Sequence, residues 1–155
     1  MNHDFNIGNC DNRDEHQEWW KYLLDNNVIA AGFDGEPLDD GERILRKRIG
    51  EGELIFAYAS LDPGYHDHGY VGVGLAKSRE TYKLLDPSMP QPHRRDIQWL
   101  YYVESLGDAM PAKEIGVPYP VSTWQSINDD KAEKILRAFW QNPKTVIRFT
   151  ANQTF

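Results

Sequence analysis

The sequence predicts an α+β domain built on a small, curved and mostly antiparallel β-barrel flanked by helices. Segments in the middle of the chain alternate between apolar and other residues, which is typical of strands, and helical patterns lie near both ends. Gly72 and Gly74 stand two apart on one expected strand, where glycine either relieves crowding in a sharply bent sheet or admits a ligand to the backbone. The 155 residues fit a single domain spanning 1–155, with the barrel at about 28–128.

Two longer helices are expected, one near each end. Residues 14–25 (DEHQEWWKYLLD) place Trp19 four residues before Leu23, and acidic residues crowd their first turn, which suits a helix N-terminus. Residues 130–141 carry an apolar stripe at helical spacing after a capping aspartate. A shorter helix is expected at about 41–49.

Four strands are expected between these helices. They cover 28–33, 53–60, 69–78 and 93–106. Residues 116–127 are expected to be irregular, with a short turn or helical piece near their end. Residues 146–150 (VIRFT) could add an edge strand.

The charge is divided unevenly along the chain. Seventeen basic and 24 acidic side chains give a net charge of −7, which argues against nucleic-acid binding because phosphate contacts need positive charge. Residues 1–42 hold 11 acidic and 2 basic side chains, whereas residues 43–155 hold 13 acidic and 15 basic ones. The expected barrel and C-terminal helix are therefore slightly basic as a whole.

Several protein classes find no support in the sequence. A single cysteine, Cys10, excludes an internal disulfide framework and a cysteine-rich zinc site. No segment resembles a signal peptide, and no apolar run approaches the ~18 residues of a membrane span. No Gly-x-Ser-x-Gly or Walker motif is present. We therefore expect a cytoplasmic, non-enzymatic protein without a cofactor or a membrane partner.

His66 and His68 are weak candidates for metal ligands. On an extended chain, two histidines two residues apart point the same way and can chelate a metal. Because a third ligand is not identifiable, a solvated turn is the favoured interpretation. A metal-dependent enzyme that uses this pair and Asp67 is the least favoured of three functional hypotheses.

Basic side chains gather in the middle of the sequence. The segment His93-Arg94-Arg95 immediately precedes or begins an expected strand, and seven further basic residues lie between positions 43 and 83: Arg43, Arg46, Lys47, Arg48, Lys77, Arg79 and Lys83. If these side chains converge in space, they form a phosphate-binding patch on an acidic protein. The alternative is that each is an isolated, solvated charge.

Four aromatic residues are candidates for a ligand pocket. Phe33 and Tyr58 stand at or near the ends of expected strands, Trp99 follows the basic segment, and Trp124 lies in a proline-bounded loop. Aromatic rings in such places stack on an extruded base. Each residue taken alone is more often structural, as are the aromatic residues on the two helical stripes.

The order and spacing of these segments resemble the EVE domain of the PUA-like superfamily, a relative of the YTH readers of methylated adenine. The resemblance is carried by VIAAGFDG (28–35), GELIFAYAS (52–60), GYVGVGLAKS (69–78), HRRDIQWL (93–100) and, more weakly, AKEIGVPYPVSTWQSI (112–127). It implies a compact β-barrel that binds nucleic acid, particularly modified bases flipped into an aromatic pocket.

The resemblance also implies residue roles. Phe33 would be a pocket wall, Ser60 and Trp99 further lining, and His93, Arg94 and Arg95 phosphate contacts. The chain departs from the family pattern in having Phe33 where tryptophan is frequent and Gly52-Glu53 where Gly-Asp opens the strand.

The leading prediction is a reader of DNA or RNA that holds a base, either plain or modified, among Phe33, Tyr58 and Trp99. The alternative is a protein-interaction or small-ligand module on the same barrel, without nucleic-acid binding. In either case the acidic N-terminal region would suit a basic protein partner.

Overall fold

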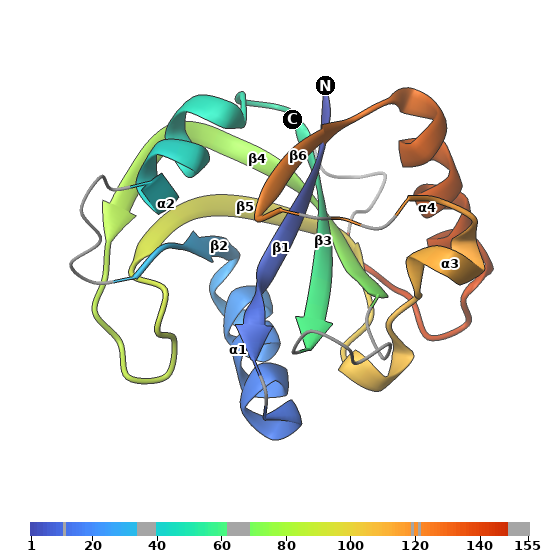
Figure 1. The fold of residues 1–155 in the computed structure, drawn as a ribbon, viewed down its shortest axis with the longest axis horizontal. Coiled ribbons are helices and arrows are strands. Elements are labelled where there is room, and N and C mark those ends of the chain that lie inside the picture. The colour runs from blue at the N-terminus through green and yellow to red at the C-terminus, as the bar shows by residue number, and fades with distance from the viewer. Residues whose placement is uncertain (11, 34–39, 62–68, 119, 121, 149–155) are drawn as a thin grey trace.

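The computed structural model folds the chain around one curved sheet of seven strands (Figure 1). The structure describes residues 1–10, 12–33, 40–61, 69–118, 120 and 122–148. The strands are β1 (Asn2–Cys10), β2 (Val28–Ala31), β3 (Leu54–Leu61), β4 (Gly69–Lys83), β5 (His93–Tyr102), β6 (Trp124–Ile127) and β7 (Val146–Ile147). Their order is β2-β5-β4-β3-β1-β6, with β7 paired to β5, and only the β1–β3 pair is parallel.

Helices cover the sheet and its ends. They are α1 (Arg13–Asn26), α2 (Asp40–Arg43), the π-helical η1 (Ile44–Arg48), the 3₁₀ turn η2 (Leu106–Asp108), α3 (Ala112–Ile115) and α4 (Asp129–Gln141). In Figure 1, α3 and α4 lie together on the side of the sheet opposite α2. No helix in the described ranges has the length and apolar character to cross a membrane.

The core joins α1 to the concave middle of the sheet. The rings of Trp20 and Trp99 meet edge to face at 5.0 Å, and both side chains are fully buried. A Cβ on Gly72 would come within 2.8 Å of the Trp20 ring, and one on Gly74 within 3.1 Å of the Trp99 ring. These two glycines therefore make room for the indoles, which is the first of the two roles expected for them.

Most of the predicted elements are present. Helices α1 and α4 confirm the predictions for 14–25 and 130–141, and β2, β3, β4 and β5 confirm the four strands. Strand β7 confirms the edge strand in part, because residues 149 and 150 lie outside the described residues. The predicted helix at 41–49 is a short α-helix that continues as a π-helix.

Three features differ from the predictions. The hydrogen-bonded strand order is open among the described residues, so closure into a barrel is not confirmed. Strand β1 was not predicted, and it pairs with both β3 and β6. The end of the segment 116–127 is the strand β6 instead of a turn or helical piece, because β1 provides a partner for its backbone.

Candidate nucleic-acid interface

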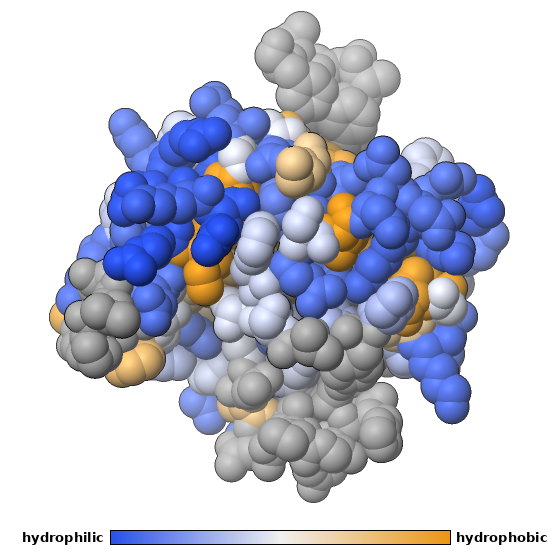
Figure 2. All heavy atoms as spheres, turned by 45° about the horizontal axis from the view of Figure 1, so that its top comes forward, coloured by the Kyte–Doolittle hydropathy of each residue, from blue (hydrophilic) through white to orange (hydrophobic). Residues whose placement is uncertain are grey.

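A basic groove lies between η1 and the far half of β4. It has a volume of about 850 Å³ and is lined by five residues: Arg46, Lys47, Arg79, Glu80 and Thr81. Figure 2 shows the most hydrophilic side chains gathered on the side of the molecule where α2 and η1 lie. Two segments that are about 30 residues apart in the sequence thus bring three cations together, as the phosphate-patch hypothesis requires.

The cations of the basic groove differ in their partners. Arg46 pairs with Glu42 at 2.6 Å, and this contact lowers the pKa of the Glu42 carboxyl below its ordinary value. Lys47 and Arg79 are exposed and have no ion-pair partner among the described residues. These two side chains therefore provide the positive charge most available to an anion.

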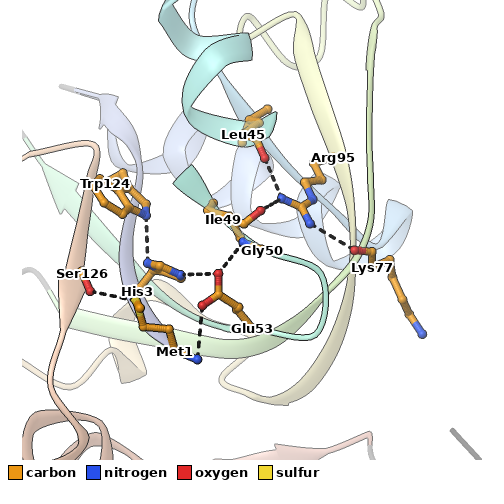
Figure 3. A network of polar contacts seen from close by, with 10 residues as sticks. All are labelled: Met1, His3, Leu45, Ile49, Gly50, Glu53, Lys77, Arg95, Trp124 and Ser126. Carbon is orange, nitrogen blue, oxygen red and sulfur yellow. Dashed lines mark hydrogen bonds and ion pairs between the residues drawn. The ribbon is translucent and has the colours of Figure 1, made fainter. Parts of the chain in front are cut away.

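Arg95 supports the basic groove from inside. Its side chain is fully buried, and its guanidinium donates to the carbonyl oxygens of Leu45 in η1, of Ile49 just after η1 and of Lys77 in β4 (Figure 3). It also donates to the carbonyl oxygen of Ser78 in β4. Burial lowers the pKa of this guanidinium below its ordinary value. Arg95 thus holds together the two segments that line the groove, and its guanidinium is bonded to backbone carbonyl oxygens.

An apolar cleft adjoins the basic groove along the chain. It has a volume of about 400 Å³ and is lined by the segment that joins β4 to β5: Leu84, Leu85, Asp86, Pro87, Met89, Pro90 and Pro92. Leu84 and Leu85 are 44% and 66% exposed. At a strand rise of ~3.3 Å per residue, the three steps from Thr81 to Leu84 span roughly 10 Å, so the nearest lining residues of the groove and of the apolar cleft follow each other closely along one stretch of backbone.

Arg94 lies beneath the segment that lines the apolar cleft. Its side chain is 1% exposed, its Nη2 donates to the Met89 carbonyl oxygen at 3.4 Å, and its guanidinium lies 5.5 Å from the centre of the Tyr22 ring. The Nε and Nη1 atoms have no hydrogen-bond partner among the described residues. A buried Gln91 side-chain oxygen, Oε1, has none either.

Phe33 follows β2 and is 59% exposed. The residue two before it, Ala31, pairs with His93 in β5, and His93 pairs on its other side with Lys83, the residue next to Leu84. The same end of the sheet therefore carries Phe33, the start of β5 and the apolar cleft. Among the aromatic residues predicted to form a pocket, Phe33 is the one with a largely exposed side chain.

Tyr58 and Trp99 are in the core instead. Tyr58 packs edge to face on Tyr70 at 4.9 Å, and the Trp99 indole donates to the Leu23 carbonyl oxygen at 3.0 Å. Both side chains are fully buried. The structure therefore does not bring them together with Phe33 around an exposed surface.

Ser60, His93 and Trp124 also have structural surroundings. Ser60 is 8% exposed and accepts a hydrogen bond from the Asn6 side chain at 3.0 Å. His93 is 6% exposed, and the Trp124 indole donates to His3 at 3.0 Å. The metal candidates His66 and His68 lie outside the described residues, within which no cluster of metal-ligating side chains is found.

Comparisons with known proteins identify the fold. No family model and no curated protein matches the chain. The YTH domain of Zygosaccharomyces rouxii MRB1, solved in complex with N6-methyladenosine RNA, matches with a TM-score of 0.57 and 16% identity, covering 90% of this chain and 87% of that one. The protein PSPTO5229 from Pseudomonas syringae matches with a TM-score of 0.51 and 12% identity, covering 89% and 99%. The chain therefore shares the fold of a YTH domain, whereas the identity is too low to transfer any residue's role.

Proposed function

We propose that this protein is a non-enzymatic reader that binds single-stranded RNA. The observation that carries the proposal is the basic groove, which gathers Lys47 and Arg79 on a protein of net charge −7. Phosphate contacts dominate the affinity of such proteins, and they require local rather than net positive charge. The RNA-bound YTH domain with the same fold supports RNA over DNA.

In this proposal the nucleic-acid backbone crosses the basic groove and one base enters the apolar cleft. The separation of roughly 10 Å between Thr81 and Leu84 along β4 suits a backbone at one feature and a base at the other. Phe33 provides an exposed ring at the same end of the sheet, and stacking on an aromatic ring is worth ~1–3 kcal/mol per base. A modification on that base would contact the aliphatic lining.

A second candidate function is the binding of a small apolar ligand or a peptide without nucleic acid. The observation that favours it is the lining of the apolar cleft, which consists of leucine, methionine and proline side chains with one aspartate. Such a surface suits an aliphatic side chain as well as a base. Salt dependence separates the two functions, because phosphate contacts weaken steeply with salt and apolar contacts do not.

The test is the binding of a fluorescently labelled single-stranded RNA followed by anisotropy at several salt concentrations. We expect binding that weakens with salt. The double variant K47Q/R79Q should bind more weakly, and its salt slope should fall by about one for each phosphate that it no longer contacts. A control variant, K134Q/R137Q, removes the same charge from α4, where both cations are exposed and paired within the helix. Equal reductions of affinity in the two variants, or no salt-dependent binding by the wild type, would contradict the proposal.

A further inference from the structure

Two unpartnered polar groups adjoin the segment that lines the apolar cleft, since Arg94 contacts the Met89 carbonyl oxygen and Gln91 stands between Pro90 and Pro92. Arg94 presents Nε and Nη1 without an acceptor, and Gln91 presents Oε1 without a donor, in the described part of the chain. The Gln91 amide passes so near the backbone of Gly8 that a Cβ there would come within 2.3 Å of its nitrogen, and the Trp19 ring lies beside the same point. Because Trp19 and Tyr22 are one turn apart on α1, both groups face the same helix.

Such groups are costly unless a partner meets them. A buried guanidinium without a carboxylate loses its hydration and gains no ion pair in return. The large majority of buried side-chain donors and acceptors have a hydrogen-bond partner, so a buried group without one requires an explanation. The one hydrogen bond that Arg94 makes, to the Met89 carbonyl oxygen at 3.4 Å, is longer than the 2.7–3.2 Å that is usual for such bonds.

We propose that Arg94 and Gln91 read the base that enters the apolar cleft, and that this base carries a carbonyl oxygen next to a ring N–H, as guanine and uracil do. This inference rests on the proposed function. The base carbonyl accepts from the unused Nη1 of Arg94, and the ring N–H donates to Gln91 Oε1. The unbranched Met89 side chain lines the cleft, so it can shift to admit the base.

The surroundings favour a neutral base edge over a phosphate. The leucine, methionine and proline side chains above Arg94 would strip the water from a phosphate without replacing it, whereas a planar base buries its faces there. Arginine paired with a guanine carbonyl is also the commonest specific contact between proteins and bases. Adenine and N6-methyladenine carry no carbonyl oxygen, so they leave Arg94 without that acceptor.

The experiment compares short oligocytidine RNAs that differ only at a central base, which is guanine, uracil, adenine or N6-methyladenine. We expect guanine and uracil to bind about tenfold more tightly than the two adenines, which is the discrimination of one good base contact. The variant R94M should bind all four alike. The groove variant K47Q/R79Q should weaken all four by a similar factor and keep the preference.

The outcomes separate this inference from the proposed function. Equal binding of the four RNAs, tighter binding of either adenine, or a preference that survives in R94M overturns the inference alone. If no RNA binds in a salt-dependent way, the proposed function fails and the inference fails with it. The wild-type series needs no variant, so it decides the inference alone if circular dichroism shows that R94M does not fold.

Discussion

Three arginines that stand near one another in sequence or space have different roles. Arg79 is exposed at the basic groove, Arg94 is buried with donors unused, and Arg95 is buried with its guanidinium donating to four backbone carbonyl oxygens. Alternation along β5 explains the difference between the last two, because successive side chains in a strand point to opposite faces. The sequence motif alone could not distinguish an exposed arginine from one that is buried and bonded to the backbone.

The variant R95M tests the structural role of Arg95. Removing the guanidinium leaves carbonyl oxygens at the end of η1 unpaired, so we expect the free energy of unfolding to fall by at least about 1.5–3 kcal/mol, the value of one hydrogen bond to a charged group. Urea denaturation followed by circular dichroism measures this decrease. The matched variant R79M removes an exposed arginine and should change stability by about 0.5 kcal/mol or less. A stable R95M protein would show that η1 does not depend on these hydrogen bonds.

At the scale of elements, the helices and strands with a clear apolar periodicity could be predicted from the sequence. A strand with polar residues at buried positions could not. Helix α4 and strands β3 and β5 follow apolar periodicity, and the structure confirms them. Strand β1 lacks that signal because His3 and Asp4, two of its buried positions, are polar. The hydrogen-bond partners of His3 and Asp4 lie in β6 and α4. The burial of these two polar side chains is therefore explained only by the folded structure.

Asp4 ties β1 to helix α4. Its carboxylate accepts from the Lys131 ammonium at 2.6 Å and from the Tyr70 hydroxyl at 2.9 Å, and it is fully buried. Burial raises the pKa of the Asp4 carboxyl above its ordinary value, although Lys131 and Tyr70 act in the opposite direction. Removing only one partner of this pair is therefore strongly destabilising, because it leaves the other charge buried and unpaired.

The variant K131M leaves the Asp4 charge buried and unpaired, so we expect the free energy of unfolding to fall by about 3–5 kcal/mol at neutral pH. The double variant D4N/K131M should be less destabilised than K131M alone, because it removes the stranded charge. A carboxyl whose folded-state pKa is raised favours the folded state below its unfolded-state pKa and loses that contribution as the pH rises. The K131M deficit should therefore shrink on acidification.

Chemical denaturation at several pH values measures these effects, and K134M serves as the control. Lys134 lies on the same helix, exposed and paired with Asp130 at 3.3 Å, so its removal should cost no more than about 1 kcal/mol. Additive effects in the double variant would show that Asp4 and Lys131 are not coupled.

At the scale of the molecule, a chain of polar contacts crosses the sheet (Figure 3). The peptide unit between Ile49 and Gly50 accepts from Arg95 through its carbonyl oxygen and donates to the Glu53 carboxylate through its N–H. Glu53 also lies 3.1 Å from His3 Nε2, and His3 accepts from the Trp124 indole. The contacts thus link β5, η1, the turn between η1 and β3, β1 and β6.

The assembled fold also explains how much of the site could be predicted. The sequence raised the hypothesis that ten basic residues converge, and the structure brings three of them, Arg46, Lys47 and Arg79, together at the basic groove. The sequence could not indicate that Trp99 would be enclosed, since that depends on Trp20 and the small residues Gly72 and Gly74 meeting across the fold. Enclosure is a property of the assembled layers, and the local pattern around a residue does not contain it.

Glu53 makes this polar chain sensitive to acid. Desolvation is the largest single influence on its carboxyl and raises the pKa, but the contacts from His3, the Gly50 N–H and the amino terminus together outweigh it, so the pKa lies below its ordinary value of 4.5. A carboxyl with a lowered folded-state pKa stabilises the folded state above its unfolded-state pKa. That contribution disappears as the pH falls through the folded-state value.

The variant E53Q should therefore be less stable than the wild type at neutral pH, and the difference should shrink as the pH falls below about 4.5, the ordinary pKa of a glutamate. Urea denaturation between neutral and acidic pH gives both curves. The control E51Q changes an exposed carboxylate two residues earlier, which has no hydrogen bond or ion pair among the described residues, and its curve should follow the wild type. A constant difference between E53Q and the wild type across the pH range would mean that the Glu53 charge does not stabilise the junction of η1, β1 and β6, and that packing alone holds it.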